Sequence, residues 1–420
     1  MSQNQTISVV GLGYIGLPTA AMFASRRIKV VGVDVNPDVV KAINAGKIHI
    51  VEPDLDIAVH SVVSEGWLRA TTVPEPADSF LIAVPTPFRG PGRQPDLSYV
   101  EAAARTIAPV LARGNLVVLE STSPVGATER MAEILAEARP DLTFPATHGA
   151  DSDIRIAHCP ERVLPGRVMQ ELITNDRLIG GLTQKCSETA AQLYKLFVTG
   201  SCIFTDARTA ELAKLTENSF RDVNIAFANE LSLVCDGLGI DVWELIRLAN
   251  RHPRVNILQP GPGVGGHCIA VDPWFIVSSA PDTARLIRIA REVNDAKPEW
   301  VLDKVRNAVA ATLLDQPGRT AGDLTVAVYG LAFKPDIDDL RESPALSIAS
   351  ELARMLPRPI AVVEPNIAAL PKTLENARLA SAEECAGADI HVMLVDHSGF
   401  KSMPKPQGVV IDTRGVWAGR

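Results

Sequence analysis

The feature that most constrains this chain is a glycine-rich motif near its start, GLGYIG at residues 11–16. The motif follows an apolar run at 7–10, which is typical of a buried parallel strand, and it opens a predicted helix over 16–25. A second predicted strand, at 29–33, leads directly into Asp34. This order of strand, glycine turn, helix and strand predicts a βαβ unit of a parallel sheet.

The motif also predicts a bound dinucleotide. Gly11 permits the tight turn, Gly13 lets the backbone approach a pyrophosphate, and Gly16 allows close packing of helix on strand. At Asp34 a carboxylate can accept hydrogen bonds from both ribose hydroxyls and would repel a 2′-phosphate. No arginine stands beside it, so we expect NAD rather than NADP; the alternative is a glycine turn without a ligand. The expected contacts within the motif are Gly11, Gly13, Tyr14, Ile15 and Gly16.

Strand and helix signals continue to alternate in the first half of the chain. Asn36 followed by Pro37 has the pattern of an N-cap with proline at the first helical position. The remaining signals are strands at 80–84, 116–119 and 154–157, and helices near 98–112 and 127–138. This alternation predicts a doubly wound parallel sheet.

The middle of the chain is helical by pattern. The segment 206–237 lacks Pro and Gly until its end, and a second helical block covers 282–314 with a bend expected at Pro298. Helices this long between two α/β regions indicate a domain bridge and a dimer interface. The alternative is that they only cover a sheet.

After a polar linker at 315–323 the α/β alternation resumes. The expected elements are strands at 324–329, 360–363, 390–395 and 409–411, and a helix at 343–355 capped by Ser343 with Pro344 at its first position. The two ends of the chain share a short motif, VVGLG at 9–13 against VYGLA at 328–332. We therefore predict two Rossmann-like, doubly wound parallel-sheet domains joined by a long central helix region, with domains over 1–205, 206–314 and 315–420.

Composition narrows the partners and the compartment. The 420 residues carry a net charge of −8 and no basic cluster, which argues against nucleic acid but leaves an anionic small-molecule substrate open. The six cysteines are scattered without a CxxC pair, which is typical of reduced, cytosolic proteins. The sequence has no apolar run of membrane-spanning length and no leader pattern, so we expect a cytoplasmic protein.

The segment GPGVGGHC at 261–268 places a thiol at the end of a glycine loop. Asp272 follows Cys268 by four residues and would share a helix face with it, and a thiol at a helix N-terminus is a usable nucleophile. The alternative is a buried structural cysteine. The adjacent pairs at 158–159 and 267–268 lack the spacing of zinc ligands, so we expect no metal.

Other polar residues extend this constellation. Lys214, Asn218 and Arg221 lie at i, i+4 and i+7 on the first long helix, where a lysine and an asparagine one turn apart can polarise a carbonyl, unless the stripe is only a solvated face. Glu161 on a strand-end loop is a candidate for activating water. Lys334 and Arg341 follow a later strand and can serve phosphates; the alternative is that they are solvated loop charges. The loops VPTP at 84–87 and ESTSP at 120–124 also follow strands.

Together these motifs resemble the UDP-glucose/GDP-mannose dehydrogenase family over essentially the whole chain. The segments that carry the resemblance are GLGYIGLP at 11–18, VPTP at 84–87, EST at 120–122, PER at 160–162, Lys214 with Asn218, GGHC at 265–268 with Asp272, and GLAFKP at 330–335. Within the family, the runs IHIVEPDL at 48–55 and NRHPRVNILQP at 250–260 resemble members that oxidise UDP-N-acetyl-D-mannosamine for bacterial surface polysaccharides.

The resemblance implies a four-electron oxidation of the sugar C6 alcohol to a carboxylate by two NAD⁺ in turn. Cys268 would attack the aldehyde to give a thiohemiacetal and then a thioester, which water hydrolyses. Lys214 and Asn218 would stabilise the oxyanion, and Asp272 would handle the proton. Glu161 would position or activate the water, and Thr122 would help to hold the cofactor or that water.

The resemblance further implies a homodimer or dimer of dimers built on the long helices. The cofactor contacts that it adds to the glycine motif and Asp34 are Pro85, Thr86, Thr122 and Arg341. The substrate contacts are Glu161, Arg162, Val163, Leu164, Lys214, Asn218, Arg221, Arg251, His252, Arg254, Asn256, Gly265, Phe333 and Lys334.

One departure from the family pattern bears on the sugar. Members acting on UDP-glucose carry a lysine just before the catalytic aspartate, where this chain has Val271. This disfavours UDP-glucose and supports an N-acetylated sugar.

Three rival functions stay open. UDP-N-acetylglucosamine as substrate would use the same chemistry, and a two-electron hydroxyacid-type dehydrogenase would not need Cys268. A non-catalytic NAD-sensing module is the alternative from another class.

Overall fold

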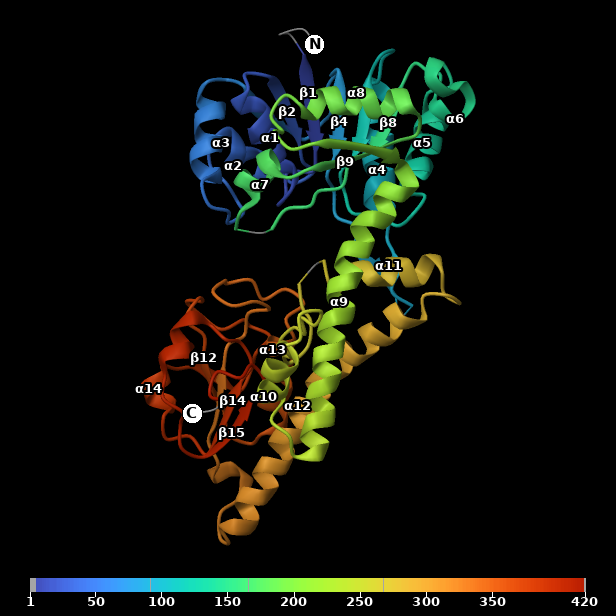
Figure 1. Ribbon diagram of the computed structural model, residues 1–420. Helices are drawn as coiled ribbons and strands as arrows, with labels where there is room; N and C mark the ends of the chain where they lie inside the picture. The colour runs from blue at the N-terminus through green and yellow to red at the C-terminus, as the bar shows by residue number, and fades with distance from the viewer. Residues whose placement is uncertain (1–4, 91, 165, 267, 419–420) are drawn as a thin grey trace. The chain divides into compact units, whose positions relative to one another are not determined.

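The computed structural model describes residues 5–90, 92–164, 166–266 and 268–418 (Figure 1). The chain forms two compact units. The first comprises Met1–Glu217 with Trp274–Pro281, and the second comprises Asn218–Pro273 with Asp282–Arg420. The division into domains 1–205, 206–314 and 315–420 stays a prediction.

The first unit is built on an eight-stranded sheet, counted over its described residues, with strand order β10-β9-β8-β7-β4-β1-β2-β3. The strands are β1 Thr6–Val10, β2 Lys29–Val33, β3 Leu68–Thr71, β4 Ser79–Ile82, β7 Leu116–Leu119, β8 Arg155–His158, β9 Arg177–Gly181 and β10 Cys202–Asp206. The small ladder of β5 (Phe88–Arg89) and β6 (Gln94–Pro95) is separate from this sheet. The helices are α1 Gly16–Ser25, α2 Pro37–Asn44, α3 Leu55–Ser64, α4 Ser98–Ile107, α5 Ala127–Ala138, α6 Pro145–His148, α7 Val168–Thr174 and α8 Gln184–Tyr194.

The predicted parallel sheet is confirmed for the strands β3, β2, β1, β4, β7 and β8, and two further strands extend it at one edge. The β8–β9 pair is antiparallel and β9–β10 is parallel, so β9 and β10 run opposite to the other strands. Neither strand was predicted. Both lie at one edge of the sheet, where reversed strands are common in α/β proteins, and the partly exposed β10 lacks the continuous apolar run of a central strand.

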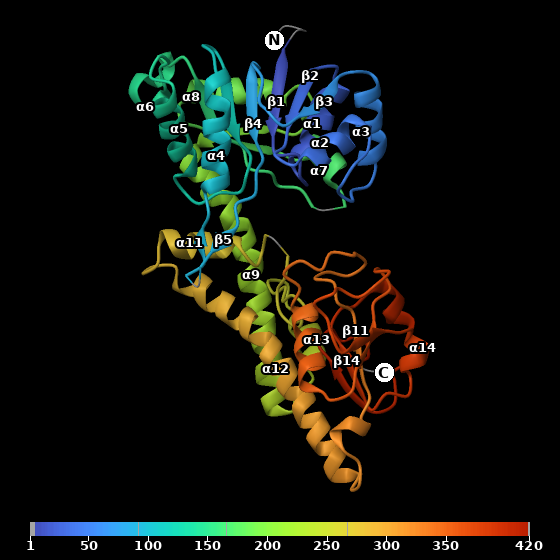
Figure 2. The ribbon, with the colours of Figure 1, turned by 180° about the vertical axis from the view of Figure 1, so that it is seen from behind.

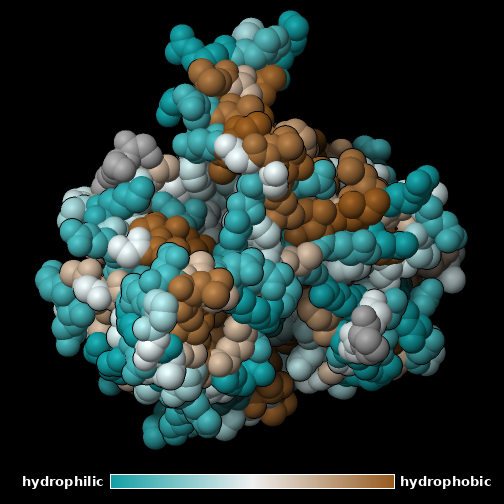
Figure 3. All heavy atoms as spheres, turned by 90° about the horizontal axis from the view of Figure 1, so that it is seen from below, coloured by the Kyte–Doolittle hydropathy of each residue, from teal (hydrophilic) through white to brown (hydrophobic). Residues whose placement is uncertain are grey.

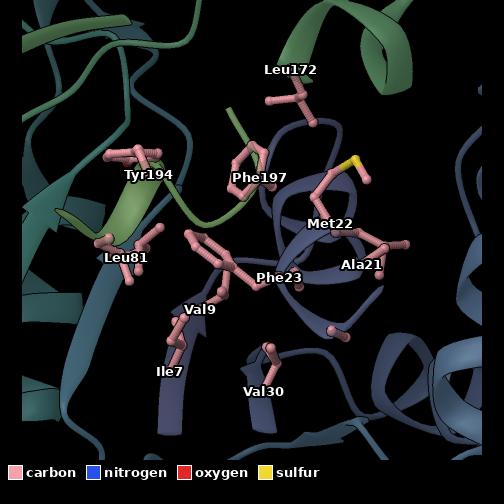
Figure 4. Packing of buried hydrophobic residues seen from close by; sticks show 14 of the residues in the cluster. Ile7, Val9, Ala21, Met22, Phe23, Val30, Leu81, Leu172, Tyr194 and Phe197 are labelled. Atoms are coloured by element: carbon pink, nitrogen blue, oxygen red, sulfur yellow. The ribbon is translucent and has the colours of Figure 1, made fainter. Parts of the chain in front are cut away.

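The two faces of the sheet bury separate cores, because side chains alternate along each strand. Ile7 and Val9 of β1 pack with α1, while Val10 packs on the other face with α4 and α5. Figure 4 shows the first core, where Phe23 of α1 lies beside Phe197. Their ring centroids are 4.7 Å apart in an edge-on arrangement. The sheet is thus covered on both faces, as a doubly wound fold requires.

The second unit contains a five-stranded parallel sheet, counted over its described residues, with order β13-β12-β11-β14-β15. The strands are β11 Val326–Tyr329, β12 Ile360–Val363, β13 Ala377–Leu379, β14 Ile390–Met393 and β15 Val409–Asp412. The remaining helices are α9 Ala207–Leu238, α10 Val242–Ala249, α11 Asp272–Ser279, α12 Arg285–Asp315, α13 Pro344–Met355 and α14 Ala382–Cys385. Of these, α9 and α11 have residues in both units. Residues of α12 and α13 bury one face of the sheet, and Phe400 and Trp417 help to bury the other.

The long helices run side by side in both ribbon views (Figure 2). The helix expected at 206–237 is α9, and that expected at 282–314 is α12, with Pro298 inside it. The predicted N-caps are also present, since Asn36 accepts from the Asp38 amide and Ser343 from the Leu346 amide. Among the described residues, no helix combines the length and the apolar character that crossing a bilayer requires.

Candidate active site

The glycine motif forms the turn between β1 and α1 in the first unit. Gly11 has a φ of +92°, and a Cβ there would lie 2.5 Å from the carbonyl oxygen of Ala83. A Cβ on Gly16 would lie 1.8 Å from the carbonyl oxygen of Gly11, so neither position accepts a side chain. Gly13 instead faces open space. The turn therefore offers accessible backbone at the N-terminus of α1, which suits a pyrophosphate.

Asp34 holds this turn from the end of β2. Its Oδ2 accepts from the Leu12 amide at 3.0 Å, and its Oδ1 accepts from the Asn36 amide at 2.9 Å. Each carboxylate oxygen can accept a second bond, so these contacts leave capacity for ribose hydroxyls. Tyr14 lies exposed on the same turn, and Ile15 is half-buried. The arrangement fits a dinucleotide without a 2′-phosphate.

The loops after β4 and β7 meet beside this turn. The Thr86 hydroxyl donates to the carbonyl oxygen of Thr122, and the Ser121 hydroxyl donates to that of Val84 at 2.7 Å. Because β7, β4 and β1 are neighbouring parallel strands, both loops lie at the carboxyl edge where ligands of such sheets bind. The fold thus gathers Thr86, Thr122 and the neighbouring Pro85 near the glycine motif.

A buried ionic cluster surrounds Glu161. Arg177 donates to its Oε2 at 2.5 Å, and the Arg162 amide donates to its Oε1 at 2.6 Å. Arg177 also lies over the ring of Tyr194, whose hydroxyl donates to Glu120 at 2.5 Å. Burial raises the pKa of Glu120 to about 7, against the opposing field of Arg177. Both carboxylate oxygens of Glu161 are thus held by hydrogen bonds.

Sequence reasoning missed most of this cluster. Arg177 begins β9, the strand next to the edge strand β10, and Tyr194 ends α8, and neither position carries a local signal. Glu120 had one available signal, since it directly follows β7 in a loop that was already of interest. Only the tertiary fold brings these three side chains to Glu161.

The neighbours of Glu161 are tied to α9 and α7. The Arg162 guanidinium pairs with Glu217 at 2.6 Å, three residues beyond the half-buried Lys214 on α9. Val163 is half-buried, and the amide of the exposed Leu164 donates to Glu171 on α7 at 2.8 Å.

In the second unit the predicted Cys268, Asp272 and Asn218 come together. The Asp272 amide donates to the carbonyl oxygen of Cys268 at 2.8 Å, and Asn218 Nδ2 donates to Asp272 Oδ2 at 2.5 Å. Asp272 and Asn218 are buried, whereas Cys268 is exposed. We expected Cys268 and Asp272 to share a helix face. Instead, α11 begins only at Asp272, and Cys268 lies in the turn before it, so an exposed thiol precedes a buried carboxylate by one turn.

The glycine loop that leads to Cys268 packs against Phe333. A Cβ on Gly265 would lie 2.4 Å from the carbonyl oxygen of Glu342 and 2.9 Å from Cβ of Phe333. Gly266 has a φ of +83°, and its Cβ would lie 2.9 Å from the Phe333 ring. The loop therefore needs glycine to lie this close to the segment after β11, and two predicted substrate contacts, Gly265 and Phe333, are neighbours.

The remaining predicted residues lie on exposed surfaces. Arg341 is paired with Asp339 at 2.6 Å within its own loop, and Lys334 is exposed nearby. Arg221 is exposed on α9. The four predicted residues between α10 and the glycine loop, all exposed, are Arg251, His252, Arg254 and Asn256.

The described residues contain no group of three or more His, Cys, Asp or Glu side chains arranged for a metal ion. Burial lowers the pKa of His158 to about 3 and raises the pKa of the Cys159 thiol, which keeps both uncharged in the core. Residue 267, from the second pair considered for zinc, lies outside the described residues.

Comparison with known proteins accounts for these features. Residues 5–198 match the NAD-binding domain of the UDP-glucose/GDP-mannose dehydrogenase family, residues 208–296 its central domain and residues 327–419 its UDP-binding domain. An "NDP-N-acetyl-D-galactosaminuronic acid dehydrogenase" of Ralstonia nicotianae is 63% identical over 420 residues, covering 99% of this chain and 97% of that protein. A "UDP-N-acetyl-D-mannosamine dehydrogenase" of Escherichia coli is 64% identical over 417 residues, covering 98% and 99%.

Solved structures agree with these relatives. The UDP-D-ManNAc dehydrogenase of Pyrococcus horikoshii superposes with a TM-score of 0.85 at 40% identity, covering 99% of this chain and 96% of that one. Because the three domain models follow one another along a chain that such relatives match over nearly its full length, the protein belongs to the UDP-glucose/GDP-mannose dehydrogenase family and is an NAD-dependent enzyme.

Proposed function

We propose that this enzyme oxidises the C6 alcohol of UDP-N-acetyl-D-mannosamine to the carboxylate in two successive steps. The main support for this proposal is the exposed Cys268 thiol, which lies one turn before Asp272 of the buried, hydrogen-bonded pair Asp272–Asn218. A one-step alcohol oxidation needs no nucleophile, whereas oxidation to an acid proceeds readily through a thiol adduct. The names of the relatives from E. coli and P. horikoshii support the sugar.

The proposed reaction proceeds through an adduct on Cys268. The alcohol loses a proton and a hydride to become an aldehyde, and the Cys268 thiolate adds to its carbonyl carbon to form a thiohemiacetal. Loss of a second hydride gives a thioester, and attack by water releases the acid and regenerates the thiol. NAD⁺, when bound, accepts the hydride in each oxidation, so the balance is two NADH per sugar. Lys214 and Asn218 would stabilise the oxyanions, and Asp272 would exchange the proton.

The cofactor and the hydrolytic water have their own proposed contacts. The turn at Gly11 to Gly16, with Asp34, would hold the dinucleotide, and Thr86 with Thr122 would line its side. Glu161 would orient the water, in keeping with its fixed position between Arg177 and the Arg162 amide.

The sugar has a second candidate. The R. nicotianae relative is named for an N-acetyl-D-galactosaminuronic acid, and it matches this chain at nearly the same identity as the E. coli relative. Both names denote N-acetylated sugars, and Val271 in place of a lysine agrees with that class. We therefore propose an N-acetylgalactosamine nucleotide as a second candidate substrate, beside the UDP-N-acetylglucosamine considered from the sequence.

We also propose that the enzyme is a homodimer or a dimer of dimers formed through α9. Phe220, Phe227 and Val234 follow one another at intervals of seven residues on this helix and are 68%, 53% and 49% exposed. An exposed apolar stripe of this spacing suits packing against a second helix. On the face shown in Figure 3, apolar side chains likewise form patches among hydrophilic ones.

Sedimentation of the wild type and of Phe227→Glu tests the dimer. We expect dimers or larger for the first and dissociation for the second, and a monomeric wild type would contradict the assignment. We further propose that the product serves bacterial surface-polysaccharide synthesis and that the enzyme works in the cytoplasm, where a catalytic thiol stays reduced.

The function is tested by counting NADH per sugar at limiting substrate. UDP-N-acetylmannosamine, UDP-N-acetylgalactosamine, UDP-N-acetylglucosamine and UDP-glucose would be compared on the wild type, on Cys268→Ser and on the control Cys202→Ser, which alters an edge strand outside the site. We expect two NADH per UDP-N-acetylmannosamine for the wild type and the control, and loss of acid formation in Cys268→Ser. Full turnover by Cys268→Ser would refute the thiol mechanism, and preference for another sugar would reassign the substrate.

A further inference from the structure

A chain of buried polar side chains links α9 to α12 within the second unit. Asp222 and Asn229 on α9, and Arg291 and Asn294 on α12, are each at most 1% exposed. Asp222 and Asn229 follow Asn218 by four and eleven residues, so all three lie on one face of the helix. Burying polar groups is costly, and hydrogen bonds between them offset that cost only in a defined arrangement. Each of the four side chains makes at least one such bond, although Oδ2 of Asp222 and Nε of Arg291 have none among the described residues.

The hydrogen bonds of this cluster converge on Asp222. Arg291 donates to Oδ1 of Asp222 at 2.6 Å, and Nδ2 of Asn294 donates to the same oxygen at 2.8 Å. Asn294 therefore turns its own oxygen toward Asn229, whose Nδ2 donates to it at 2.8 Å. That leaves Oδ1 of Asn229 to accept from the Gly261 amide, also at 2.8 Å. The ion pair at one end thus dictates which atom Asn229 presents at the other.

The partner of Asn229 is the beginning of the glycine loop that carries Cys268. The same loop touches α12 again, because a Cβ on Gly263 would lie 3.3 Å from the carbonyl oxygen of Asn294. Pro298 stands four residues after Asn294 and has no amide hydrogen, so this carbonyl lacks its usual helical partner. A carbonyl released from the helix therefore faces the loop.

The far end of the loop is held by the same face of α9. Asn218 donates to Asp272, and the Asp272 amide donates to the carbonyl oxygen of Cys268. One helix face therefore anchors the loop before its glycines, through Asn229, and after its thiol, through Asn218. The glycines between the two anchors have little conformational preference of their own, so the anchors set where the thiol lies.

We infer that Asn229 is a positioning residue for the Cys268 loop, oriented through Asn294 by the Asp222–Arg291 ion pair. The inference deepens the proposed function, since it concerns how the nucleophile of that reaction is placed. Asn229 touches no reacting atom and acts only through the backbone of Gly261.

Hydrogen exchange of the Gly261 amide gives a direct test on the full-length enzyme. Pro260 and Pro262 carry no amide hydrogen, so Gly261 is the only exchanging backbone site in that tripeptide. Asn229→Leu keeps the side-chain shape but removes both the acceptor for the Gly261 amide and the donor to Asn294. Ser232→Ala is the control, because Ser232 lies on the same buried face but does not contact the loop. Its hydroxyl accepts from Lys297 and donates to the main-chain carbonyl of Asn229, so this substitution leaves the Asn229 side chain with its own partners.

In Asn229→Leu we expect the Gly261 amide to exchange about tenfold faster and kcat to fall about tenfold, because one buried hydrogen bond is lost. The KM for NAD should change little. Iodoacetamide labelling of Cys268, followed by mass spectrometry, should change in rate as well. Ser232→Ala should resemble the wild type in all three measurements.

Unchanged exchange and labelling in a folded Asn229→Leu enzyme would overturn the inference, as would equal effects from Ser232→Ala. If Asn229→Leu does not fold, Asn294→Leu replaces it, and faster Gly261 exchange is again the expected result. Exchange and labelling need no turnover. If the wild type oxidises no nucleotide sugar, the proposed function fails while these two measurements still decide the positioning role.

Discussion

Replacing Glu120 by glutamine should change how the stability of the first unit depends on pH. Glu120 is 1% exposed, accepts a hydrogen bond from Tyr194, and lies in the same buried cluster as Arg177 and Glu161. Glutamine has the same shape and keeps an acceptor for Tyr194, but it cannot ionise. The substitution therefore removes a charge from the core while leaving the packing in place.

The expected magnitude comes from the shifted pKa. Burial raises the pKa of Glu120 from 4.5 to about 7, so the folded state holds this proton more tightly than the unfolded state. Folding stability from this group is therefore lost as the pH rises from 4.5 through 7. Because proton binding and folding are linked, ionisation of Glu120 lowers the free energy of unfolding by about 1 kcal/mol at pH 5 and about 3 kcal/mol at pH 8.

Thermal unfolding of the wild type and of Glu120→Gln between pH 5 and 8 measures this difference. A unit of this size changes its melting temperature by about 2–4 °C per kcal/mol. The difference in melting temperature between Glu120→Gln and the wild type should therefore be about 4–8 °C larger at pH 8 than at pH 5, in favour of the variant. Glu133→Gln on the exposed face of α5 is the control and should show no such gain. A gap between Glu120→Gln and the wild type that stays constant with pH would refute the reasoning.

Two further substitutions test the second unit. Gly265→Ala would place a Cβ 2.4 Å from the carbonyl oxygen of Glu342, so we expect the glycine loop to shift. Turnover should then fall at least tenfold while the melting temperature changes little. Normal turnover would contradict this close packing of the loop. Arg291→Leu leaves Asp222 buried without its cation, and chemical denaturation should show a loss of about 3–5 kcal/mol, with a smaller loss when Asp222→Leu is added. A loss below about 1 kcal/mol, the value for a surface pair, would contradict the buried assignment.

The elements that could be predicted from the sequence are those specified by neighbouring residues. The helix at 16–25 and the strands at 29–33 and 116–119 have the expected bounds, because apolar runs and glycine turns are local signals. The Asn36 and Ser343 caps are likewise short-range hydrogen bonds. The reversed β9 and β10 were not predicted, because strand direction depends on the path of the whole chain.

The candidate site divides in the same way. Cys268 and Asp272 are four residues apart, and the glycines of the dinucleotide turn lie within six residues, so local spacing made both candidates. The sequence by itself thus determined the cofactor turn and the family, and it proposed the thiol.

Only the tertiary structure decided what surrounds them. Asn218 reaches Asp272 across 54 residues, Tyr194 reaches Glu120 across 74, and Asn229 reaches Gly261 across 32. Such pairs follow no periodic pattern in the sequence. A polar side chain needs a specific partner only after folding has removed the water around it, because leaving it unpaired is then costly in free energy. Burial created the ion pair of Glu161 and the chain of hydrogen bonds behind the cysteine loop, and no local pattern predicts burial of that kind.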